Sequence, residues 1–224
     1  MTAPKFFVVA HVISRKGALP FWEKRLDALC GVSATESLGD SYYWGQDLNG
    51  DPDSIWGLEG YTHAAGFFLG HVSTDIFKRE MKLVDDDLLL KSVQGLGSPD
   101  YDLYHYDQYG GYLKKPDDKD KDSVTSHVAV HHFWAKDPAD QTKILDALNK
   151  FSESTKSVEG VQSALVLKAI VVPELATLWI RTKTQDDYKS FEPKLAALAS
   201  ELKPLISKTE VYQSRSFIGH LDLK

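Results

Sequence analysis

Two histidines in the first half of the sequence could carry acid–base chemistry. His71 follows Phe68 by three residues and Phe67 by four, which places it at the edge of the apolar face of a predicted helix. His11 lies in the middle of an apolar run that predicts a strand. The unperturbed pKa of histidine lies near neutral pH, so either side chain could act as a general base. The alternative for both is structural: a helix cap at His71 and a hydrogen-bonded core residue at His11.

Aromatic side chains of the same half could line a pocket. Tyr42 and Trp44 share one face of a predicted strand and could stack on a flat ligand. Tyr104 and Tyr106 share one face of a later strand, and Tyr106, which has no counterpart in the second half, is a candidate hydrogen-bond donor. A sheet filled by aromatic core residues is the alternative. Because 17 of the 25 aromatic residues lie in residues 1–113, the pocket is expected in that half.

Trp56 and Glu59 lie three residues apart on one predicted strand and therefore point to opposite faces. Trp56, which shares its face with Leu58, is expected to form part of the pocket wall. Glu59 is either a general base or a carboxylate bonded to a neighbouring side chain of the sheet. The residues expected to contact a substrate are Tyr42, Trp44, Trp56, Glu59, Phe67, Phe68 and Tyr104.

The sequence lacks the usual signatures of metal and nucleotide sites. His131 and His132 are adjacent on a predicted strand and point apart, and the run Asp85–Asp87 lacks the spacing of a calcium loop. No glycine-rich nucleotide-binding motif follows a strand. The single cysteine, Cys30, excludes an internal disulfide. We therefore expect no metal and no cofactor.

Composition and charge narrow the class of protein. The chain of 224 residues has a net charge of −6, and neither half has the basic excess of a nucleic-acid binder. No apolar run approaches the roughly 18 residues of a membrane span, and the N-terminal segment lacks the pattern of a secretory signal. We expect a cytoplasmic protein that binds neither nucleic acid nor a membrane.

The pattern of predicted elements occurs twice. Each half consists of a strand, a helix, two strands, a helix and a strand, and the charged stretch 114–125 separates the halves as a solvated linker. Thr62 and Thr184 are expected to cap the second helix of each half. The predicted strands are 6–13, 41–48, 54–61 and 101–113 in the first half, and 127–134, 161–170, 174–182 and 211–221 in the second.

Matching residues indicate that the second half is a duplicate of the first. A shift of 108 residues aligns Tyr104 with Tyr212, and a shift of 120 residues aligns His11 with His131. Each βαββαβ unit is ferredoxin-like, with an antiparallel sheet and both helices on one face. The first strand is apolar at odd and even positions, as expected when both faces are buried. We predict an α+β fold in which the two sheets pack on each other as an intrachain pseudo-dimeric α+β barrel. Two unrelated α+β domains are the alternative.

Two short motifs in the first half resemble the antibiotic-biosynthesis-monooxygenase-like family, whose single-domain members form dimeric α+β barrels. Residues 55–61, Ile-Trp-Gly-Leu-Glu-Gly-Tyr, are similar to the family's third strand. Residues 71–78, His-Val-Ser-Thr-Asp-Ile-Phe-Lys, are similar to its helix-to-short-helix segment. The second half keeps the element order but has no histidine in 186–205. The resemblance implies an active repeat at 1–113, a charged linker at 114–125 and a degenerate repeat at 126–224.

The resemblance also implies an enzyme of secondary metabolism that acts on a hydrophobic aromatic or polyketide-like substrate. The best-known activity of the family is the oxidation of anthrones or phenols by O2 without metal or flavin. In such an oxygenase His71, His11 and Tyr106 would be the catalytic residues. The alternatives are a cyclase, isomerase or decarboxylase that uses the same pocket, and a non-catalytic metabolite-binding barrel. Because one chain carries both sheets, we expect a monomer rather than a homodimer.

Overall fold

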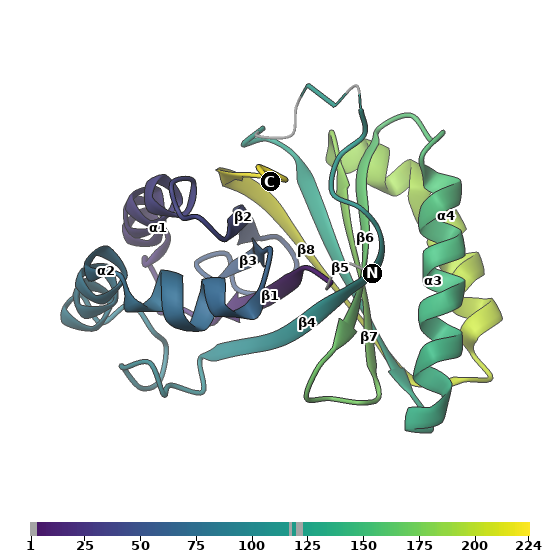
Figure 1. Cartoon of the computed structure of the whole chain (residues 1–224), viewed down its shortest axis with the longest axis horizontal. Helices are drawn as coiled ribbons and strands as arrows, with labels where there is room; N and C mark the ends of the chain where they lie inside the picture. Colours follow the sequence, from purple (N-terminus) through teal and green to yellow (C-terminus); the bar gives the residue numbers. More distant parts are fainter. Residues whose placement is uncertain (1–3, 117, 120–122) are drawn as a thin grey trace.

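The computed structural model describes residues 4–116, 118–119 and 123–224. Within them, eight antiparallel strands close one barrel in the order β1-β3-β2-β8-β5-β7-β6-β4. Helices α1 and α2 lie outside the first-half strands, and α3 and α4 lie outside the second-half strands (Figure 1). None of the helices in the described ranges is long and apolar enough to cross a membrane.

The observed elements follow the predicted order in both halves. The first half contains β1 (Phe6–Val12), α1 (Leu19–Ser33), β2 (Gly39–Asp47), β3 (Ile55–Tyr61), a π-helical turn (Gly66–Gly70), a 3₁₀ turn (His71–Ser73), α2 (Asp75–Asp86) and β4 (Tyr101–Tyr112). The second half contains β5 (His127–Ala135), a 3₁₀ turn (Pro138–Asp140), α3 (Gln141–Thr155), β6 (Val161–Ala169), β7 (Leu175–Thr182), α4 (Gln185–Leu202) and β8 (Ile206–His220).

The two halves are joined by strand pairing as well as by packing. Each half forms a ferredoxin-like sheet, with order β4-β1-β3-β2 in the first and β8-β5-β7-β6 in the second. Strand β2 pairs with β8, and β4 pairs with β6, so both edges of each sheet are hydrogen-bonded to the other sheet. The predicted pseudo-dimeric α+β barrel is confirmed, and the closed barrel leaves no free sheet edge.

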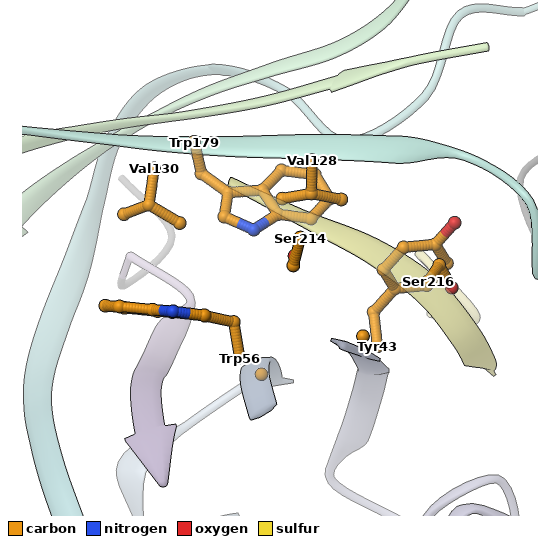
Figure 2. Close-up of a pocket in the computed structure, with 9 residues that line it drawn as sticks. Tyr43, Trp56, Val128, Val130, Trp179, Ser214 and Ser216 are labelled. Atoms are coloured by element: carbon orange, nitrogen blue, oxygen red, sulfur yellow. The ribbon is translucent and has the colours of Figure 1, made fainter. Parts of the chain in front are cut away.

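Both faces of the barrel wall are buried along β1, β2, β3, β5, β6 and β7, whereas β4 and β8 have exposed positions. The pleat of each strand divides its side chains between the two faces. In β1, Phe7 and Val9 join the core inside the barrel, whereas Phe6 and Val8 pack under the helices. Figure 2 shows side chains from both halves meeting inside the barrel. The interior residues in this view are Tyr43, Trp56, Val128, Val130, Trp179, Ser214 and Ser216. They leave a cavity of only about 10 Å³ among them, so the barrel is a packed core and not a channel.

Helical structure begins near Thr62, at Ala64, but the predicted capping role of Thr62 is wrong. The backbone N–H of Thr62 bonds the carbonyl of Leu38, and the chain then passes through the π-helical and 3₁₀ turns before α2. Helix α2 begins only after Thr74, whose hydroxyl accepts the N–H of Phe77. The prediction for α4 is confirmed, because Thr184 forms a capping box with Asp187.

The alignment of His11 with His131 is wrong by one residue. His11 lies opposite Asp102 in the sheet, and His132 lies opposite Glu210, the counterpart of Asp102 on β8. The true counterpart of His11 is therefore His132, and His131 points to the other side of the wall. Because β1 and β5 are apolar on both faces, their hydrophobic pattern could not fix the register.

One residue of the linker is buried, contrary to the expectation of a solvated segment. The carboxylate of Asp118 pairs with the guanidinium of Arg181, and these two side chains are 2% and 0% exposed. Arg181 also donates to Ser163 Oγ at 3.0 Å and to Gln162 Oε1 at 3.0 Å. The linker positions 117 and 120–122 lie outside the described residues. The pair ties the linker to β7.

We predict that Asp118→Asn destabilises the fold by about 3 kcal/mol, because it removes the carboxylate that pairs with the buried charge of Arg181. The free energy of unfolding in urea measures the effect. The matched control is Asp86→Asn, which removes an exposed carboxylate paired with Lys82 and should cost at most about 0.5 kcal/mol. Equal losses in the two variants would contradict a special role for the buried pair.

Candidate functional site

A cavity of about 270 Å³ lies between the first-half sheet and the helices that cover it. Its walls are mainly apolar and come from β1, α1 and α2, with Ala10, Leu26 and Met81 as representatives. At the mouth, Phe68 and Leu96 are 49% and 66% exposed. An enclosed apolar space with an exposed apolar rim is typical of a site for a hydrophobic small molecule.

Two aromatic residues of β2 face the cavity because even-numbered positions of this strand point toward the helices. Tyr42 and Trp44 both line it, and their ring centroids lie 6.0 Å apart. The Trp44 indole crosses over Gly57 of β3, where a Cβ atom would lie 2.5 Å from the ring. Because Gly57 has no side chain, the indole can occupy this position in the cavity wall.

Glu59 is the carboxylate of the cavity. It lies on β3, is buried, and accepts a hydrogen bond of 2.9 Å from the Tyr61 hydroxyl. Burial raises the pKa of Glu59 above its usual value, although the charge of His71 and the bond from Tyr61 act in the opposite direction. A carboxyl with a raised pKa in an apolar cavity is suited to take up and return a proton near neutral pH.

His71 lies directly behind the cavity wall. It is fully buried in the 3₁₀ turn, and its ring packs against Tyr42 at 5.7 Å and Phe77 at 5.4 Å, both of which line the cavity. Its Nδ1 lies 2.8 Å from Glu36 Oε1. Burial lowers the pKa of His71, but the bond to Glu36 and the charges of Glu59 and Glu36 outweigh it, so the pKa is raised. The carboxylates of Glu36 and Glu59 therefore favour the protonated, positively charged form of His71.

Several buried polar atoms that line the cavity have no hydrogen-bond partner within the described ranges. They are the Tyr42 hydroxyl, Trp44 Nε1 and His105 Nε2. Burial, followed by the charge of Glu59, raises the pKa of Tyr42 well above its usual value, while the adjacent Trp44 side chain opposes the rise. The Tyr42 hydroxyl thus stays protonated and can donate. Unpaired buried polar groups are rare in folded proteins, so these atoms are available to bond a water molecule or a ligand in the cavity.

The residues singled out in the sequence fall on two sides of the barrel wall. Tyr42, Trp44, Glu59, Phe67 and Phe68 line the cavity. His11, Trp56, Tyr104 and Tyr106 lie on the interior side instead, away from this cavity.

The four interior residues have partners there. His11 stacks on Trp56 with centroids 4.4 Å apart, and its Nε2 lies 3.4 Å from an oxygen of Asp47. The Tyr106 hydroxyl accepts a bond of 3.0 Å from Thr177.

Sequence analysis missed Glu36, Tyr61 and His105 as site residues. Tyr61 follows Glu59 by two residues, so strand periodicity alone places them on one face. His105 alternates with Tyr104 and Tyr106, which were chosen instead. Glu36 lies in the loop between α1 and β2, where no periodic signal exists. In the described part of the chain, no group of three or more histidine, cysteine or acidic residues could hold a metal ion.

Several solved structures have the same fold over nearly the whole length of this chain, at low sequence identity. A protein from Fusobacterium nucleatum, provisionally named a monooxygenase, matches with a TM-score of 0.80 and 12% identity over 100% of this chain and 99% of its own. A similarly named protein from Lactobacillus acidophilus matches with 0.76 and 11% over 97% and 96%. A protein called anthrone oxidase-like matches with 0.66 and 10% over 97% and 93%. No family model and no curated protein matches the chain.

These likenesses establish the architecture of the chain. It has the α+β barrel fold of the monooxygenase-like proteins that the motifs predicted, in a form in which one chain supplies both halves. At 10–12% identity the comparison shows the fold alone.

We predict that Glu36→Gln lowers the pKa of His71, because the variant removes the negative charge of Glu36 and leaves at most a neutral hydrogen bond in its place, so that less opposes the effect of burial. Nitrogen-detected NMR of the imidazole across pH measures this directly. In the wild type, protonated His71 stabilises the fold, fully so below the unfolded pKa of about 6.5, and this contribution disappears as pH rises through the higher folded pKa. Glu153→Gln, at an exposed glutamate paired with Lys156, is the control. An unchanged His71 pKa in Glu36→Gln would rule out this coupling.

Proposed function

We propose that the protein is an oxygenase that oxidises a hydrophobic aromatic or polyketide-like metabolite with O2, without a metal or organic cofactor. The observation that carries the proposal is the buried Glu59 in a mainly apolar cavity, next to the buried hydroxyl of Tyr42. The names of the structural neighbours agree with this class of reaction.

The cavity favours a flat, mostly apolar substrate with one oxygen-bearing edge. Its volume of about 270 Å³ is close to the lower end of typical ligand pockets. Trp44, Phe67 and Phe68 offer ring faces and edges for stacking. The Tyr42 hydroxyl and Trp44 Nε1 are donors for a phenolic or carbonyl oxygen, which would satisfy both groups.

The proposed reaction begins when Glu59 removes a proton from an activated CH2 group of the substrate, such as that of an anthrone. The resulting carbanion transfers electrons to O2, and a C–O bond forms to give a peroxide anion. Glu59 returns the proton to this anion, which yields a hydroperoxide. Loss of water, with the second C–H proton, leaves a C=O group, so one CH2 and one O2 become one C=O and one H2O.

His71 acts in this scheme as a positioning residue. Its positive charge, held by Glu36, stabilises the ionised form of Glu59 that must exist before proton removal. Tyr61 fixes one carboxylate oxygen through its hydrogen bond. Electrostatic groups of this kind act strongly when they are shielded from water, and both Glu59 and His71 are buried.

The proposal assigns the chemistry to the repeat at 1–113, joined by the linker 114–125 to a repeat at 126–224 that lacks this constellation. In the second half, Ile180 occupies the position of Glu59, and Ala164 occupies that of Tyr42. A role in secondary metabolism and a cytoplasmic location belong to the same proposal.

We predict that Glu59→Gln lowers turnover of an anthrone by about 10²–10⁴-fold, the usual contribution of a general base. Oxygen consumption and product mass, with metal-free protein, are the measurements. His11→Gln is the matched control: His11 lies inside the barrel, so this variant should turn over like the wild type. Product formation without oxygen uptake would favour a cyclase, isomerase or decarboxylase. Binding without any product would favour a non-catalytic barrel.

We predict a monomer in solution, because both edges of each sheet are already paired within the chain. Light scattering should give a mass near 25.1 kDa. A mass of about twice this value that persists on dilution would reject the monomer.

A further inference from the structure

The second half of the chain has a cavity of its own. It has a volume of about 360 Å³ and lies between α4 and the strands β5 and β8. Phe133, Leu195 and Ala199 make much of its surface apolar. It opens at the outer side of the barrel, as the first-half cavity does.

The two cavities occupy equivalent places in the duplicated fold. The first is lined on β4 by Tyr101, Leu103 and His105. The second is lined on β8 by Thr209, Val211 and Gln213, each 108 residues later. The neighbouring strands agree, because Ala10 and Val12 of β1 correspond in register to His131 and Phe133 of β5. This coincidence of lining positions shows that the cavity is a feature of the repeat and not an accident of surface shape.

The floor of the second cavity differs from that of the first. The positions of Glu59, Tyr42 and Trp44 are taken by Ile180, Ala164 and Val166, which are fully buried in the aliphatic core. These three residues do not line the second cavity, and no carboxylate stands at the position equivalent to Glu59. A site of this kind can bind but lacks the proton acceptor that the oxidation requires.

The second cavity contains a neutral polar pair, which lies at a different position from that of Glu59 in the first. His131 is buried, and its Nε2 lies 3.2 Å from the Tyr188 hydroxyl of α4. Burial, with a smaller effect of His132, lowers the pKa of His131 to about 3, so the ring is uncharged at physiological pH. Glu192 is exposed beside the cavity and disfavours an anionic ligand.

We propose that the second cavity is a binding site for a neutral, hydrophobic ring compound with a hydroxyl or carbonyl group, held by the His131–Tyr188 pair without chemical conversion. The site does not depend on the proposed oxidation, since binding here requires neither Glu59 nor O2. With this site the barrel has two cavities: the first, in which the proposed oxidation takes place, and the second, in which a ligand is bound without reaction.

Methyl NMR separates the two sites with 1-naphthol as the probe. Met81 lines the first cavity, and Ala196 and Ala199 line the second, so ¹³C-methyl labels on methionine and alanine report each site independently. We expect the Ala199 methyl signal of the wild type to shift saturably with 1-naphthol. If it does not shift, the proposal is overturned, whatever happens at Met81.

Ala196→Trp provides the second arm, because Ala196 is exposed on α4 and a larger side chain there fills the cavity without entering the core. We expect Ala196→Trp to abolish the shift at Ala199 and to leave any shift at Met81 unchanged. The matched control is Ala197→Trp, one residue further on the same helix, exposed and outside the cavity lining. Retained binding in Ala196→Trp, or equal loss in Ala197→Trp, would place the probe elsewhere and reject the site.

Discussion

The closed barrel imposes one constraint on most of its strands: both faces of β1, β2, β3, β5, β6 and β7 are buried, so their side chains must lie either inside the barrel or under the helices. None of these strands can relieve a mismatch by turning a face to water, and a shift of one residue exchanges the two sets. Glu59 reaches the cavity, and Trp56 the interior, because they lie an odd number of residues apart on β3. The cavity, its carboxylate and the packed interior therefore all follow from the same pleat.

A buried carboxylate is costly, and the structure around Glu59 shows how the cost is limited. Tyr61 donates to it, and His71 supplies positive charge from behind the wall. His71 can take this place only because the chain departs from a regular helix between Gly66 and Ser73, where a π-helical turn leads into a 3₁₀ turn. Such π-helical segments often occur at functional sites. The irregular segment and the carboxylate form one unit.

The sequence predicts most of the fold and part of the site. Strand periodicity and the repeated element order were enough to predict the barrel. The odd spacing of Trp56 and Glu59 correctly placed them on opposite faces of β3. The register of His11 could not be predicted, since an apolar run buried on both faces carries no marker of its own phase. The prediction that Thr62 caps a helix failed because a threonine before a helical pattern can also bond a neighbouring loop, as Thr62 bonds Leu38. Glu36 comes from a loop, and its contact with His71 exists only in three dimensions.

The joining of both halves in one chain has a genetic consequence. In a barrel built from two identical chains, every substitution appears twice, so a change that suits one pocket is imposed on the other. Here one chain contains both halves, so a single substitution changes only one of the two pockets. Ile180 can stand where the first half has Glu59, and each half is free to be selected for its own ligand while the shared strand pairing preserves the common scaffold.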